Sequence, residues 1–110
     1  MKLKSICKDA LEAFGLDKQI DMCIEECAEL QNALMKFRRG RATFEDVRTE
    51  IADVQIMCDQ MSIAFGEKQT LVEKFRKLER LSLRIDEHKV HVKVKESARN
   101  ERSQRATNPV

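Results

Sequence analysis

Apolar side chains recur along the chain at the three- and four-residue spacing of amphipathic helices, which turn about 100° per residue. The segment from Asp17 to Arg38 carries one apolar face, made of Cys23, Cys27, Leu30, Leu34 and Phe37. A second face lies between Phe44 and Phe65 and consists of Val47, Ile51, Val54, Met57, Cys58, Met61 and Phe65. A third comprises Leu71, Leu78, Leu81 and Ile85. The pattern predicts that these faces are buried.

Glycines and hydroxyl residues indicate where the helices end and begin. Gly15, Gly40 and Gly66 stand where the periodic segments stop, as is typical of helix C-terminal caps. Thr43 precedes Asp46 by three residues and Thr70 precedes Glu73 by three, which is the spacing of a capping box at a helix start. We therefore predict four helices, from about Leu3 to Phe14, Asp17 to Arg38, Phe44 to Phe65 and Leu71 to Ile85.

These elements predict an all-α fold in one domain. Short connections between long helices favour antiparallel neighbours, so we expect a four-helix bundle. The apolar faces exceed what a chain of 110 residues covers easily. We therefore expect a second copy to complete the bundle, as a homodimer or a dimer of dimers.

The sequence changes character after the predicted fourth helix. Residues 1–86 form the expected domain, whereas residues 87–110 are polar and basic and are expected to be a flexible tail. Val90, Val92 and Val94 alternate like a short strand, but a single strand without a partner is not a fold. His88 and His91 lie in this segment without a nearby carboxylate cluster, so we interpret them as solvated rather than as ligands.

Composition narrows the possible functions. The three Gly and one Pro favour long helices, and a net charge of +2 with interspersed signs argues against nucleic acid as the partner. The beginning of the chain lacks the apolar stretch of a signal peptide, and no run has bilayer-spanning length. Four cysteines then indicate reduced thiols, and we expect a cytoplasmic protein without a membrane partner.

Two pairs of acidic residues are the candidates for chemistry. Residues three apart on a helix share a face, so Glu26 pairs with Glu29, and Glu50 pairs with Asp53. If the two apolar faces pack together, both pairs reach the same seam. Four carboxylates there repel one another unless a cation lies among them, and Mg²⁺ prefers such oxygen ligands. The alternative is that these acids are ordinary solvated residues.

The same residues resemble a known family. EECAEL, from Glu25 to Leu30, and EIADV, from Glu50 to Val54, are similar to the EExxE and ExxD motifs of the all-α nucleoside triphosphate pyrophosphohydrolases, the MazG-like superfamily. The resemblance implies a Mg²⁺-dependent hydrolase, with Mn²⁺ as a substitute, that splits a nucleoside triphosphate into the monophosphate and pyrophosphate. It assigns metal binding to Glu26, Glu29, Glu50 and Asp53. Glu25 matches the first glutamate, which is suited to orienting or deprotonating water.

A row of cations on the predicted fourth helix is a candidate phosphate-binding site. Lys77, Arg80 and Arg84 share one face, with Lys74 as a further candidate, and KLERLSLRI resembles the basic stretch that closes the domain in small members of the family. Arginine can form two parallel hydrogen bonds to phosphate oxygens, and lysine supplies a point charge. The alternative is an exposed, solvated face. Four other cations, Lys36, Arg38, Arg39 and Arg41, are explained by the dipole at the end of the second helix.

Two functions from other classes stay open. The chain could be a helical interaction module whose apolar faces bind a partner helix, or a non-catalytic relative that binds nucleotides. The choice of base and sugar is not readable, because the chain has no Tyr or Trp and no Phe is assigned to stacking by its spacing.

Overall fold

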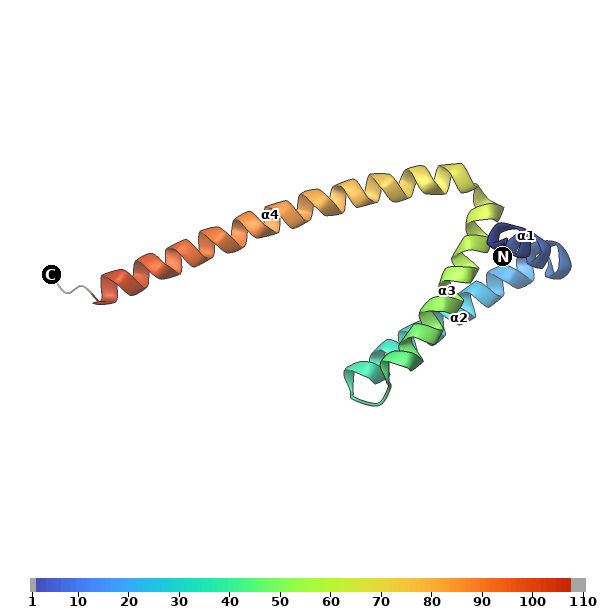
Figure 1. Ribbon diagram of the computed structural model, residues 1–110, viewed down its shortest axis with the longest axis horizontal. Coiled ribbons are helices and arrows are strands. Elements are labelled where there is room, and N and C mark those ends of the chain that lie inside the picture. Colours follow the sequence, from blue (N-terminus) through green and yellow to red (C-terminus); the bar gives the residue numbers. More distant parts are fainter. Residues whose placement is uncertain (1, 108–110) are drawn as a thin grey trace. The chain divides into compact units, whose positions relative to one another are not determined.

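The computed structural model describes residues 2–107, and its regular elements are four helices (Figure 1). They are α1 (Leu3–Phe14), α2 (Leu16–Arg38), α3 (Phe44–Phe65) and α4 (Glu67–Thr107). The predicted all-α class is confirmed, and the predicted limits of the first three helices agree with the structure to within one residue. None of the described helices combines the length and the apolar character that a bilayer span requires.

The predicted glycine caps at the ends of the first three helices and the predicted capping box at the start of α3 are confirmed. Gly15, Gly40 and Gly66 all have positive φ, a conformation that costs other residues energy because of their Cβ atoms. At the start of α3, the Asp46 N–H donates to the Thr43 hydroxyl (3.1 Å), and the Thr43 N–H donates to the Asp46 carboxylate (2.9 Å). This reciprocal capping box fixes the first turn of α3.

The fourth helix differs from the prediction at both ends. It begins at Glu67, and the Thr70 hydroxyl donates to the Gly66 carbonyl (2.6 Å), so the predicted cap at Thr70 is wrong. It continues past Ile85 to Thr107, through most of the segment expected to be a flexible tail. Lys, Arg, Glu and Ala are good helix formers, and no Gly or Pro interrupts them before Pro109, which lies outside the described residues.

The strand-like alternation at Val90, Val92 and Val94 does not form a strand, as expected for a segment without a partner, and these valines belong to α4. Extending an existing helix adds one hydrogen bond for each residue that is ordered, whereas a strand needs a partner.

The chain divides into two compact units, one ending at Thr70 and the other beginning at Leu71, and each is described by itself. In the first unit, α2 and α3 lie side by side and α1 contacts both (Figure 1). Gln19, near the start of α2, donates to Gln60, near the end of α3 (2.7 Å). At the other end the rings of Phe37 and Phe44 lie 5.2 Å apart. The two helices are therefore antiparallel, as predicted.

The core of the first unit is small, so the predicted burial of the apolar faces is only partly right. The buried residues are Cys7, Gln19, Ala33, Met57 and Gln60. Leu34 and Ile51 remain about two-fifths exposed, and Phe65 is 68% exposed. All the apolar residues of α4 are exposed too. The prediction assumed a partner for every apolar face, and within the described residues of the first unit only α1, α2 and α3 cover one another.

Candidate metal centre

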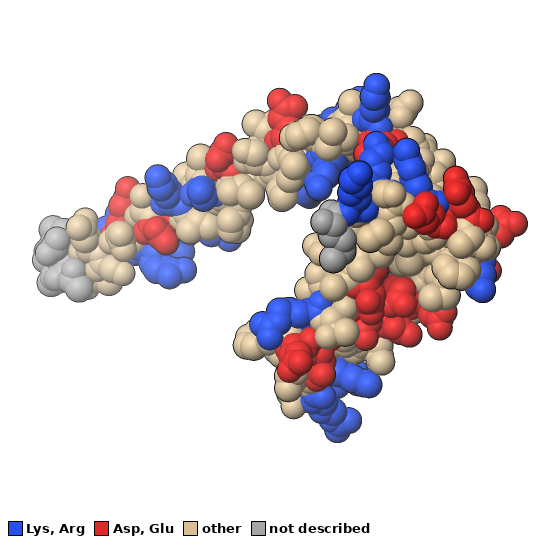
Figure 2. Space-filling view, turned by 45° about the vertical axis from the view of Figure 1, so that its right-hand side comes forward, with Lys and Arg blue, Asp and Glu red and all other residues tan. Residues whose placement is uncertain are grey.

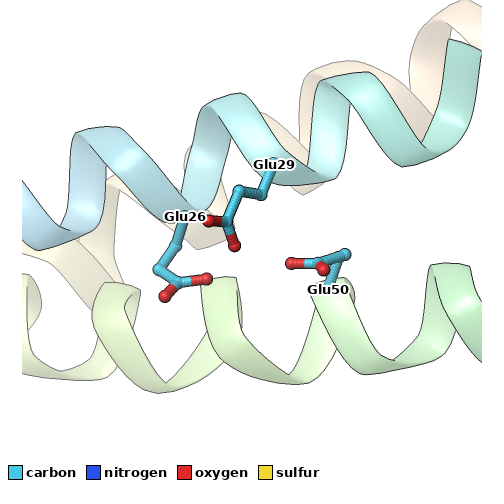
Figure 3. Close-up of side chains that lie close together, drawn as sticks. All are labelled: Glu26, Glu29 and Glu50. Carbon is cyan, nitrogen blue, oxygen red and sulfur yellow. The ribbon is translucent and has the colours of Figure 1, made fainter.

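Three glutamates from two helices form the candidate site. Glu26 and Glu29 lie one turn apart on α2, and Glu50 lies on the neighbouring stretch of α3. Figure 3 shows their carboxylates directed toward one another across the space between the helices. One oxygen from each carboxylate lies within 4.8 Å of the others. Antiparallel packing of α2 on α3 thus brings together acids more than 20 residues apart in the sequence.

Two of these carboxylates are partly withdrawn from solvent. Glu26 and Glu50 are half-buried, and Glu29 is exposed. One oxygen of Glu26 and one of Glu50 are fully buried and have no hydrogen-bond partner among the described residues. Buried polar atoms are normally satisfied, so each unpaired oxygen calls for an explanation such as a bound ion. Acidic side chains also gather on one face of the α2–α3 pair in Figure 2.

The electrostatics of the site disfavour the charged forms of these two acids. Burial, followed by the negative charges of Glu29 and Asp53, raises the pKa of Glu26 above its ordinary value. The same causes raise the pKa of Glu50. Without a cation, the cluster therefore holds protons more tightly than separated carboxylates do.

This donor set fits a small, hard divalent cation. Carboxylate oxygens are the preferred protein ligands of Mg²⁺, and a cation among them would neutralise the repulsion and satisfy the two buried oxygens. Thiolate and imidazole donors, which suit zinc, do not occur in the group.

The other predicted site residues lie outside this group. Asp53 is half-buried on α3, and its charge acts on both Glu26 and Glu50, but it does not belong to the group of three converging carboxylates. Glu25 is an exposed residue of α2. The roles assigned to these two residues stay predictions.

The predicted phosphate-binding cations belong to the second unit. Lys74, Lys77, Arg80 and Arg84 are exposed residues of α4. The one ion pair in that part of α4 joins Arg76 to Glu73 (2.9 Å) among the described residues. Participation of these cations in the site stays a prediction.

Fold and site together define a class of protein: an all-α chain in which two antiparallel helices present a carboxylate cluster suited to a divalent cation. Comparisons of the chain with models of protein families, with curated proteins and with solved structures found no match. The resemblance to the MazG-like superfamily therefore stays a prediction from the two acidic motifs of the sequence.

Proposed function

We propose that this chain is a Mg²⁺-dependent nucleoside triphosphate pyrophosphohydrolase of the MazG-like type. The observation that carries the proposal is the convergence of Glu26, Glu29 and Glu50, with two buried oxygens that lack hydrogen-bond partners. Acids held together in this way cost stability unless a cation offsets their charge, so a purely structural role accounts poorly for them.

The proposed reaction assigns a role to each acidic residue. Glu26, Glu29 and Glu50 would hold the ion, and Asp53 would add negative charge beside them. When bound, Mg²⁺ supplies positive charge that polarises phosphate oxygens. Glu25 orients a water molecule and accepts its proton as the water oxygen bonds to phosphorus. The phosphoanhydride bond between the α and β phosphates breaks, and pyrophosphate leaves.

A screen of nucleoside triphosphates with Mg²⁺ tests the proposal, with products separated by chromatography. We expect a nucleoside monophosphate and pyrophosphate in equal amounts, no reaction with a chelator, and activity when Mn²⁺ replaces Mg²⁺. Release of orthophosphate instead, or turnover that a chelator leaves unchanged, would contradict the proposal.

The proposal includes assembly into a homodimer or a dimer of dimers, in the cytoplasm where these substrates occur. Its support is the set of large apolar side chains left exposed on the first unit, such as Ile24 at 64% and Phe65 at 68%. Exposed apolar patches commonly mark protein interfaces. Light scattering at micromolar concentration should give at least twice the mass of one chain, and a monomer would contradict this.

The same exposed side chains favour a second candidate, a helical interaction module without catalysis. The two candidates differ in their response to metal. An interaction module should show the same melting temperature with and without Mg²⁺, whereas the proposed hydrolase gains stability from metal that binds its folded form.

A further inference from the structure

A pocket of about 400 Å³ lies beside the glutamate cluster and shares two of its residues. Glu29 and Glu50 line the pocket at one end. Lys36, on the last turns of α2, and Arg41, in the loop before α3, line it too. The pocket therefore combines the proposed metal ligands with two cations.

Helical spacing explains how the pocket separates these charges. Lys36 follows Glu29 by seven residues, which is two turns or about 10 Å along the helix axis and nearly the same face. Asn32, between them on that face, also lines the pocket, and so does Thr49 on α3. The pocket thus runs from an acidic end, past two hydrogen-bonding side chains, to a basic end.

The backbone around the basic end is held by two capping motifs. The Arg41 N–H donates to the Lys36 carbonyl (2.9 Å), and the Gly40 N–H donates to the Phe37 carbonyl (3.0 Å). This is the Schellman arrangement, which needs the positive φ of Gly40. The capping box of Thr43 and the contact between the Phe37 and Phe44 rings fix the other side of the loop. The backbone at Lys36 and Arg41 is therefore held in place before any ligand binds.

The two cations are available to a ligand. Neither Lys36 nor Arg41 forms an ion pair with another described residue. Asp46 is the acid of the pocket nearest to this end, and Lys36 helps to lower its pKa, after the hydrogen bonds from Thr43. The Asp46 carboxylate is already occupied by the Thr43 N–H. The dipole of α2 attracts every cation near its C-terminal end and does not distinguish among them. Lys36 and Arg41 line this pocket, whereas Arg38 and Arg39 do not.

We infer that this pocket binds the terminal phosphates of the substrate, with Lys36 and Arg41 contacting the oxygens that leave as pyrophosphate. The inference rests on the proposed function, because the phosphates nearer the nucleoside must lie by the metal at Glu29 and Glu50. Asn32 is placed to donate a hydrogen bond to the oxygens between these two ends, whereas the Thr49 hydroxyl already donates to the Glu45 carbonyl (3.0 Å). The cations of α4 are the competing candidates for the same phosphates.

Binding of inorganic tripolyphosphate, measured by calorimetry with and without Mg²⁺, tests the inference. The variant is Lys36→Gln with Arg41→Gln, and its matched control is Arg38→Gln with Arg39→Gln, which removes the same charge from neighbouring positions. We expect the pocket variant to lose about tenfold or more in affinity for tripolyphosphate, because charge-assisted contacts are lost, while the control changes little. Affinity for Mg²⁺ alone should be the same in all three proteins.

Two further variants separate the inference from its alternatives. Lys36→Arg with Arg41→Lys keeps both charges and should recover most of the affinity, which a loss caused by misfolding would not. A substitution of Lys77, Arg80 and Arg84 by Gln tests the competing cations of α4. If this variant loses tripolyphosphate affinity and the pocket variant keeps it, the inference is wrong and the proposed hydrolase stands. If the wild type hydrolyses no nucleoside triphosphate and binds no Mg²⁺, the proposed function fails and the inference fails with it.

Discussion

The α2–α3 pair and the fourth helix use similar residues in opposite ways. Both are rich in charged side chains, but on α2 and α3 the antiparallel packing places Glu26 and Glu50 in a partly dehydrated space. On α4 every side chain from Glu67 to Ala106 is exposed. The charges of α4 keep their water, whereas Glu26 and Glu50 lose part of theirs.

The difference shows that the effect of a charged side chain on stability depends more on its surroundings than on how many such side chains a helix carries. Exposed ion pairs such as Glu73–Arg76 contribute little to stability, since solvent screens them. Burial raises the pKa of Glu26 and of Glu50, so the same kind of side chain there opposes folding when it is ionised. Substitutions between α2 and α3 should therefore have large effects, and those on α4 should have small ones.

The largest expected effect is on turnover, in the variant Glu50→Gln. The substitution keeps the shape of the side chain and removes one proposed metal ligand, so turnover should fall by about two or more orders of magnitude. In the metal-free protein the same change relieves repulsion and should be neutral or stabilising by a few tenths of a kcal/mol. With Mg²⁺ the sign should reverse, because the variant loses most of the stability that metal binding gives.

Melting curves with and without Mg²⁺, together with assays of hydrolysis, measure these effects. Glu45→Gln is the control, because Glu45 lies on the first turn of α3 and is exposed. It should change turnover little. Equal metal-induced shifts in the wild type and in Glu50→Gln, with unaltered turnover, would contradict a metal site.

The sequence was sufficient to predict the features that depend on local chemistry. Glycine at Gly40 and the Thr43–Asp46 capping box define helix limits within a few residues, and the three-residue spacing of Glu26 and Glu29 puts both on one face. Their approach to Glu50 followed from antiparallel packing, which short loops impose.

Other features depend on the way in which the helices meet, and one sequence does not contain this information. The hydrogen bond between Gln19 and Gln60 joins residues 41 positions apart, and neither residue stands out in the pattern. The pocket at Lys36 and Arg41 was missed because the helix dipole already explained cations at that helix end. The signal that could have revealed it is the same-face spacing of Glu29, Asn32 and Lys36. The sequence does not predict the helical segment beyond Ile85, because a polar, basic composition is also typical of disorder.

A smaller effect, on stability, is expected at the buried pair of glutamines. Replacing Gln19 by Leu leaves the Gln60 oxygen buried without its donor, at a cost of about 1–3 kcal/mol. Replacing both residues by Leu should recover much of that loss, because no polar atom is then left unsatisfied. Urea unfolding measures the change, with Gln31→Leu, on the exposed face of α2, as the control. A double variant as unstable as the single one would mean that the glutamines do not act as a pair.

A still smaller effect is expected on the pH dependence of stability. Glu26 and Glu50 have raised pKa values in the folded chain, so the folded state binds protons more tightly than the unfolded state does. The free energy of unfolding of the metal-free protein should therefore gain a contribution as pH falls through the raised pKa values toward the ordinary value of 4.5. Saturating Mg²⁺ should remove this gain, because it favours the ionised carboxylates.

Urea unfolding at several pH values in chelator measures this contribution as the difference between the wild type and the variant Glu26→Gln with Glu50→Gln. The variant cannot titrate at these positions and should show a flatter profile over this range. Asp46 acts in the opposite direction, since its lowered pKa contributes stability that is lost only at more acidic pH. Identical profiles for the wild type and the variant would mean that the two glutamates titrate normally.

The smallest effect is expected from shortening α4, and it gives the sharpest test of the comparison between the two regions. Ending the chain after Lys89 removes a stretch whose described side chains are all exposed, so it removes no buried contact of a single chain. Changes at such surfaces are usually within about 0.5 kcal/mol, and the melting temperature and turnover should be nearly those of the full chain. The cations Lys74, Lys77, Arg80 and Arg84 are all retained, so a loss of hydrolysis would not reflect their removal. A shortened protein that fails to fold, or that changes its mass in light scattering, would mean that the far part of α4 is covered by another copy in the assembled protein. The difference in exposure between the two regions would then hold only for a single chain. The first residues to substitute would be the valines that follow Lys89, which are Val90, Val92 and Val94.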